Sequence, residues 1–178
     1  MTEQKMDRTP VTAERIEQIL ANVELLKELI REELDVQLRF DLESVEWLDG
    51  YIERRHLEGD TAKWDGTISV IGSFLGECIR HQIGGDWYWW DDNLGIFFNE
   101  GDAVFPFNKL RKQLENGRDG GDSILDLYRT TLVIMRHRQS TQRSAPTPRA
   151  PAPAPAPKAP APSNNWFSNF KGAGKFGG

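Results

Sequence analysis

Apolar residues recur at three- and four-residue steps in five segments of the chain, the spacing of helices with one buried face. The first segment, residues 12–34, carries the apolar stripe Ile16, Ile19, Leu20, Val23, Leu26 and Ile30. The other predicted helices span roughly residues 43–55, 67–83, 108–115 and 123–138. The heptad-like spacing of the first stripe would also suit pairing with another helix, but packing within its own domain is the simpler expectation.

The remaining pattern predicts strands. Apolar and polar residues alternate over 34–42, which indicates a short extended stretch or a helix end. Three further runs predict short strands over 87–90, 95–98 and 103–107. Turn-forming residues divide these runs, and connections this short favour an antiparallel meander. The predicted fold class is α+β, mostly helical, with a short three-stranded antiparallel meander packed by helices.

The predicted helix 67–83 is the most apolar part of the chain. Gly72 and Gly76 are four residues apart in it, so they leave a flat strip that another element can approach closely. Glu77, Arg80 and His81 make this segment a core helix of a soluble domain rather than a membrane span.

Composition changes sharply after residue 138. Eight of the ten prolines lie between Pro146 and Pro162, in an alternating Ala-Pro run that can form neither helix nor sheet. Such a run is expected to be a disordered, extended spacer, reaching roughly 55 Å at about 3.1 Å per residue. The predicted organisation is an acidic domain over 1–138, a Pro/Ala-rich linker over 139–163 and a C-terminal peptide over 164–178.

The C-terminal peptide combines aromatic and basic residues among small ones. Its aromatic residues are Trp166, Phe167, Phe170 and Phe176, and its bases are Lys171 and Lys175. Disordered segments are usually poor in aromatic residues, so these six residues are predicted to form a short docking motif. Two alternatives stay open: an end whose aromatic residues have no role, and a peptide that touches a membrane surface, which would bind only weakly by itself.

Charge separates the two parts of the chain. The formal net charge is −5, from 22 bases and 27 acids, and all the acids precede residue 139. The last forty residues hold five bases and no acid, so the part before them carries 17 bases against 27 acids. A net charge of −10 argues against DNA binding and suits a basic protein or a larger assembly as partner. The positive tail could equally dock on its own domain.

Few residues suggest catalysis or a cofactor. Cys78 is the single cysteine, which excludes an internal disulfide and a Cys-based zinc cluster and agrees with a cytoplasmic protein. A Cys78–His81 pair on one helix is poorly placed for nucleophilic catalysis. Glu77, beside the glycine strip, is predicted to have a structural role or to contribute to a binding surface. The acidic turns 91–93 and 99–102 lack the spacing of a known calcium loop, so neither a metal nor a cofactor is predicted.

Trp87, Tyr88, Trp89 and Trp90 are the strongest anomaly of the sequence. Alternate residues of a strand face opposite sides, so at least one pair should cover a surface other than the main core. Either helices cover both faces of the sheet, or an exposed pair forms a recognition surface, where Trp and Tyr are typical. These four residues, with Glu77, are the candidate binding site of the domain.

Several segments, in order, carry a resemblance. They are Val45–Glu53, Ser69–Ile79, Gly84–Trp87, Asn99–Lys109, Glu115–Gly117 and Asp122–Ile124. Over roughly residues 42–136 the chain resembles a small bacterial domain family of unknown function. The family has no assigned activity, so the resemblance implies a domain boundary and no catalytic residues.

The sequence as a whole favours a non-catalytic protein-interaction or adaptor module with a tethered docking peptide. Small acidic α+β domains also suit toxin-neutralising immunity proteins and secretion chaperones, which is the main alternative. An enzyme of unknown reaction is the third hypothesis, since His56, His81 and His137 are scattered and no catalytic signature is present. The partner, the oligomeric state and the docking target of the peptide stay open.

Overall fold

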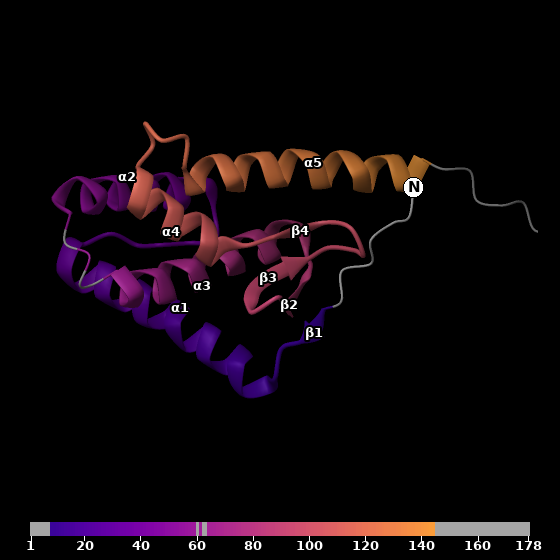
Figure 1. Ribbon diagram of the computed structural model, residues 1–178, viewed down its shortest axis with the longest axis horizontal. Coiled ribbons are helices and arrows are strands. Elements are labelled where there is room, and N and C mark those ends of the chain that lie inside the picture. Colours follow the sequence, from indigo (N-terminus) through magenta and orange to yellow (C-terminus); the bar gives the residue numbers. More distant parts are fainter. Residues whose placement is uncertain (1–7, 60, 62–63, 145–178) are drawn as a thin grey trace, which may run out of the picture. The chain divides into compact units, whose positions relative to one another are not determined.

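The computed structural model describes residues 8–59, 61 and 64–144 (Figure 1). Its helices are α1 (Ala13–Leu34), α2 (Leu42–Glu58), α3 (Trp64–Ile83), α4 (Pro106–Asn116) and α5 (Ile124–Ser144). Its strands are β1 (Thr9–Pro10), β2 (Asp86–Trp90), β3 (Asn93–Phe97) and β4 (Ala103–Val104). The predicted α+β class with dominant helices is confirmed. The prediction of a disordered tail falls on residues outside these ranges.

The sheet is antiparallel with strand order β1-β2-β3-β4, so the predicted three-stranded meander gains a fourth strand at one edge. In the added strand, Thr9 lies opposite Trp89 and Pro10 opposite Tyr88. The third predicted strand, 103–107, is shorter than expected because Pro106 begins α4. Proline at the first position of a helix is favoured, since its ring fixes a helical φ and no N–H is lost there.

Two other boundaries differ from the sequence pattern. The alternating segment 34–42 is not a strand: α1 ends at Leu34, and Asp35 takes a left-handed conformation with φ 52°. The irregular stretch that follows buries Leu38, so its alternation reflects residues that point into and out of the core. Helix α5 continues to Ser144, so residues 139–144 of the predicted linker are helical.

Helix α3 lies at the centre of the core and packs against α1, α4 and α5. On α1, the residues Ile19, Val23, Leu26 and Ile30 are buried in this core, which confirms that most of the predicted stripe packs within the domain. Leu20, predicted to belong to the stripe, is instead exposed. No helix within the described ranges has both the length and the apolar character needed to cross a membrane.

The glycine strip of α3 is the surface on which aromatic side chains pack. The ring of Phe107 lies over Gly72, and the indole of Trp87 lies over Gly76. A Cβ atom on Gly76 would come within 2.2 Å of the Trp87 ring, far inside van der Waals contact. The close approach predicted from the spacing of these glycines is therefore confirmed, and it fixes the sheet against the helix.

Gly76→Ala should destabilise the domain by about 1–3 kcal/mol, because the buried Trp87 ring must move to admit a methyl group. Gly66→Ala is the matched control on the same helix, since a Cβ there meets nothing within 4 Å. The control should change stability by no more than about 1 kcal/mol, in the stabilising direction. Chemical denaturation measures the free energy of unfolding of both variants. If the two values were equal, the packing of Trp87 would not depend on Gly76.

Candidate functional site

The four aromatic residues of β2 divide between two faces of the sheet. Trp87 lies opposite Ile96 and Trp89 opposite Leu94. Trp87, Leu94 and Ile96 are buried in the main core, and Trp89 packs against it. Tyr88 and Trp90 point to the other face and are only half-buried. The expected division of the quartet into two pairs is thus observed, with one pair on each side.

The second face is covered by aromatic rings from neighbouring strands. Tyr88 meets Phe97 edge-on with ring centres 5.7 Å apart, Phe97 meets Phe105 at 6.0 Å, and Trp90 meets Phe105 at 5.7 Å. We call Tyr88, Trp90, Phe97 and Phe105 the outer aromatic face. Phe97 is only 3% exposed although it is not part of the main core, so these side chains form a second, smaller cluster.

Gly95 makes this cluster compact. It lies opposite Tyr88 in the β2–β3 pairing and carries no side chain that would separate the rings. A Cβ atom at this position would lie 2.7 Å from the Phe105 ring. The glycine therefore leaves room for Phe105 to reach across the sheet to Trp90 and Phe97.

A cation lies on the outer aromatic face. The guanidinium of Arg8 is 4.5 Å from the centre of the Tyr88 ring and 5.2 Å from that of Phe97. The same group donates a hydrogen bond of 2.7 Å to the carbonyl oxygen of Asn99. Cation–π contacts of this kind contribute about 0.5–2 kcal/mol, depending on how far water is excluded. Sequence reasoning missed Arg8, Phe97 and Phe105 as members of the site, because only the strand register brings them to Tyr88.

Glu77 lies on the core side of the sheet, away from the outer aromatic face. It is buried, accepts a hydrogen bond of 2.8 Å from the Trp87 indole N–H, and pairs with Arg80 at 2.9 Å. Arg80 in turn donates to the carbonyl oxygen of Gly85 at 3.0 Å. The structural role weighed for Glu77 fits these contacts, which join the end of α3 to the start of β2. Neither Glu77 nor the buried Trp87 lies on the surface, so the candidate site separates into a core part and an outer part.

Cys78 and His81, the other potentially reactive side chains of α3, also contact their own fold. Cys78 is fully buried, and this burial, with the nearby Asp41 carboxylate, raises the pKa of its thiol far above the ordinary value. The His81 ring stacks on Phe40 with centres 4.7 Å apart. A thiol that stays protonated at neutral pH is a poor nucleophile.

The acidic turns have local structural functions. Asp91 and Asp92 occupy the two-residue turn between β2 and β3, both with positive φ (45° and 61°), as a tight hairpin turn requires. Asp102 accepts a hydrogen bond of 2.6 Å from Asn99 and pairs with Arg138 of α5. Across the ranges that the structure describes, no three His, Cys, Asp or Glu side chains gather in a way that could hold a metal ion.

A buried carboxylate that sequence reasoning did not single out lies between three helices. Asp49 of α2 is 1% exposed. Its Oδ1 accepts hydrogen bonds from Gln113 of α4 and Ser123 before α5, both at 2.9 Å. Its Oδ2 accepts from Arg118 at 2.7 Å. We call these four residues the Asp49 network.

The Asp49 network leaves its buried polar groups paired. The Gln113 side chain, itself fully buried, donates to Asp49 and accepts from the backbone N–H of Ile124 at 2.8 Å. Ser123 accepts from the N–H of Asp126 and so caps α5. Because the contacts of Asp49 with Gln113 and Ser123 join separate elements, the network positions α4 and α5 against α2. The Asp49 carboxylate itself is enclosed.

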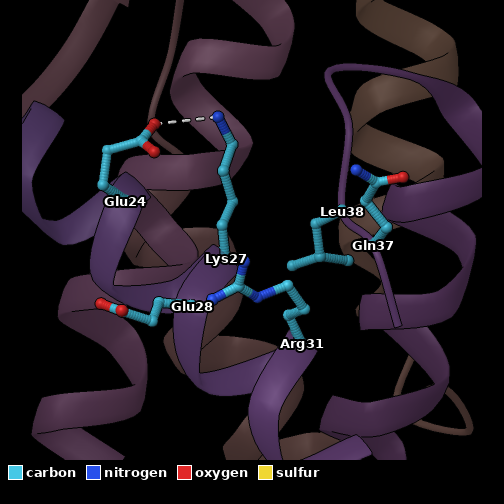
Figure 2. A pocket seen from close by; sticks show the side chains of 6 residues that line it. All are labelled: Glu24, Lys27, Glu28, Arg31, Gln37 and Leu38. Atoms are coloured by element: carbon cyan, nitrogen blue, oxygen red, sulfur yellow. Dashed lines mark hydrogen bonds and ion pairs between the residues drawn. The ribbon is translucent and has the colours of Figure 1, made fainter. Parts of the chain in front are cut away.

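A surface hollow lies between α1 and the irregular segment that follows it (Figure 2). Its lining is Glu24, Lys27, Glu28, Arg31, Gln37 and Leu38. Lys27 pairs with Glu24 at 2.9 Å and lies 4.3 Å from the Phe40 ring centre. Acids and bases alternate around this hollow, so its charge selects neither anions nor cations.

The predicted residues of the C-terminal peptide, Trp166, Phe167, Phe170, Lys171, Lys175 and Phe176, lie outside the described residues. Comparison of the chain with protein-family models, curated proteins and solved structures finds no match. The resemblance to a bacterial domain family stays a prediction.

Asp49→Asn should lower the free energy of unfolding by about 2–4 kcal/mol, because the charge-assisted hydrogen bond from Arg118 is weakened and the amide cannot accept from all three donors. Asp65→Asn is the matched control, since the Asp65–Arg111 pair is exposed. The control should cost no more than about 1 kcal/mol. If denaturation curves of the two variants coincide, the Asp49 network does not hold the helices together.

Stability should also depend on Asp102 in acid. The hydrogen bond from Asn99 and the pair with Arg138 lower the pKa of Asp102 below its ordinary value near 3.8. A lowered folded-state pKa contributes stability that is present above the unfolded-state pKa and is lost as the pH falls through the folded one. The natural protein should therefore lose more stability than Asp102→Asn between roughly pH 5 and pH 2. Glu100→Gln, in the same turn, is the control. If the stability of the natural protein and that of Asp102→Asn fell in parallel with decreasing pH, Asp102 would not have this stabilising role.

Proposed function

We propose that this protein is a non-catalytic protein-interaction module. Its outer aromatic face would be the contact surface of the domain, and its C-terminal peptide would be a second docking element. The single observation that carries the proposal is the outer aromatic face itself: three of its four rings remain partly exposed on a sheet whose other side already packs on the core. Tyr and Trp dominate binding hot spots because they bury a large area at a small entropy cost.

The environment of the reactive side chains supports a non-catalytic role. Glu77 is paired with Arg80 and Trp87, Asp49 is enclosed by its own donors, and Cys78 is a buried thiol. A catalytic acid, base or nucleophile needs access to a substrate, in addition to a shifted pKa. Each of these three groups instead contacts its own fold.

The C-terminal sequence supports a second binding element. Six aromatic or basic residues follow a Pro/Ala-rich run that favours an extended spacer. Joining two weak binding elements through a spacer raises the effective concentration of the second once the first has bound. In this proposal the partner is a protein or a larger assembly in the cytoplasm, and neither DNA nor a cofactor takes part.

A cognate inhibitor or a secretion chaperone is the second candidate, and the acidity of the folded part favours it. Residues 1–138 carry 27 acids and 17 bases, and α1 alone exposes Glu17, Glu24, Glu28, Glu32 and Glu33. Negative charge of this kind speeds the encounter with a basic toxin or effector. Such a role is a special case of protein binding and would use the same outer aromatic face.

The docking role of the tail is tested in the full-length chain. The double variant Trp166→Ala/Phe170→Ala should reduce recovery of co-purified partners at least about tenfold, because aromatic anchors of a hot spot contribute about 2 kcal/mol or more each. Ser168→Ala/Asn169→Ala changes the polar residues between them and is the matched control. Quantitative mass spectrometry of both purifications gives the measurement. Partner recovery that is the same in all three proteins would show that the peptide is not a docking element.

A further inference from the structure

We propose that the outer aromatic face binds an arginine-containing basic segment of a partner protein, and that Arg8 occupies this site in cis until the partner displaces it. The inference rests on the proposed protein-binding function and specifies the chemistry of the partner. The site consists of the Tyr88 and Phe97 rings, which receive the guanidinium, and the Asn99 carbonyl oxygen, which accepts its hydrogen bond. We call these three groups the cation site.

The geometry of Arg8 shows what the cation site accepts. Its guanidinium lies within cation–π distance of two rings at once while one N–H donates to Asn99. A planar guanidinium can stack and donate in this way, whereas an ammonium group forms a compact, more strongly hydrated charge. The site is therefore shaped for an arginine side chain, and Arg8 serves as an internal example of the ligand.

Acidic residues lie along the same strands and turns. Asp86 lies opposite Phe97, Asp91 and Asp92 follow Trp90, and Glu100 follows Asn99, whose carbonyl belongs to the site. All four side chains are exposed. Exposed acids at both ends of a low-dielectric aromatic surface raise the local concentration of cations. The same charges oppose the approach of nucleic acid or an anionic membrane, so a basic protein segment is the occupant that the charges favour.

The strand pairing of the arm that carries Arg8 is short. Strand β1 has only two residues, and one of them, Pro10, has no backbone N–H to donate to β2. An edge strand this short opens at low free-energy cost. A partner arginine with additional contacts to Trp90 and Phe105 can therefore compete with Arg8, and opening of the arm would expose Tyr88 and Phe97 to it.

The test uses the full-length protein and a fluorescein-labelled peptide, Gly-Ser-Arg-Gly-Arg-Gly-Ser, in a polarisation titration. A matched peptide with glutamine in place of both arginines is the ligand control. Arg8→Ala should bind the arginine peptide about three- to tenfold more tightly than the natural protein, because the internal competitor is gone. Tyr88→Leu in the Arg8→Ala background should weaken binding about tenfold, and thermal unfolding checks that this variant remains folded.

Arg15→Ala is the matched protein control. The Arg15 guanidinium lies 5.8 Å from the ring of Trp89, on the core side of the sheet, so its removal should leave peptide affinity unchanged. Equal binding of the glutamine peptide, or no gain of affinity in Arg8→Ala, would overturn the proposal. Concentration-dependent dimers of Arg8→Ala in sedimentation, without peptide binding, would also overturn it, since the occupant would then be a second copy.

The outcome is distinguishable from failure of the proposed function. If peptide binding fails but partner recovery still depends on Trp166 and Phe170, the cation site is wrong and the interaction module stands. If the arginine peptide binds as expected but partner recovery is the same with and without Trp166 and Phe170, the cation site stands and the docking role of the C-terminal peptide is wrong.

Discussion

The helical half of the fold depends on one buried negative charge. Burying the Asp49 carboxylate removes it from water, which costs free energy. The hydrogen bonds from Gln113, Ser123 and Arg118 offset this cost only while α2, α4 and the segment before α5 keep their positions. Hydrophobic packing alone tolerates small shifts between helices, whereas charged hydrogen bonds of 2.7–2.9 Å do not. The network therefore supplies geometric specificity, and the apolar core supplies the bulk of the stability.

On the sheet side, too, a polar contact fixes the position of a residue that packs in the apolar core. Trp87 fills the flat strip over Gly76 and is fixed by Glu77, so the inner face of β2 belongs to the core. With that face anchored, Tyr88 and Trp90 must point outward, because successive side chains of a strand alternate. The outer aromatic face is thus a consequence of how tightly the inner face packs.

Periodicity predicted the helices, the close approach at Gly72 and Gly76, and the separation of the β2 quartet into pairs, because each of these follows from local spacing. The sequence could not predict β1, since two residues carry no pattern. It left 34–42 open between an extended stretch and a helix end, and the alternation there arises in an irregular segment around Leu38. Nothing in the local sequence distinguishes Asp49 from the other polar positions of its helix. Its partners lie more than sixty residues away, as Arg8 lies far from Phe97, and only the tertiary structure brings them together.

The last helix has a mechanical consequence. Helix α5 runs without a break to Ser144, the residue before the proline-rich run, and Arg138 on it pairs with Asp102 of the β3–β4 turn. Asn99, in that turn, holds both Asp102 and, through its carbonyl oxygen, Arg8. A pull on the chain beyond Ser144 would therefore load a short series of polar contacts that ends at the N-terminal arm. The same helix is also joined to the core through the buried Met135 and through the hydrogen bond from Gln139 to the Ile83 carbonyl oxygen, so the core would carry part of that load.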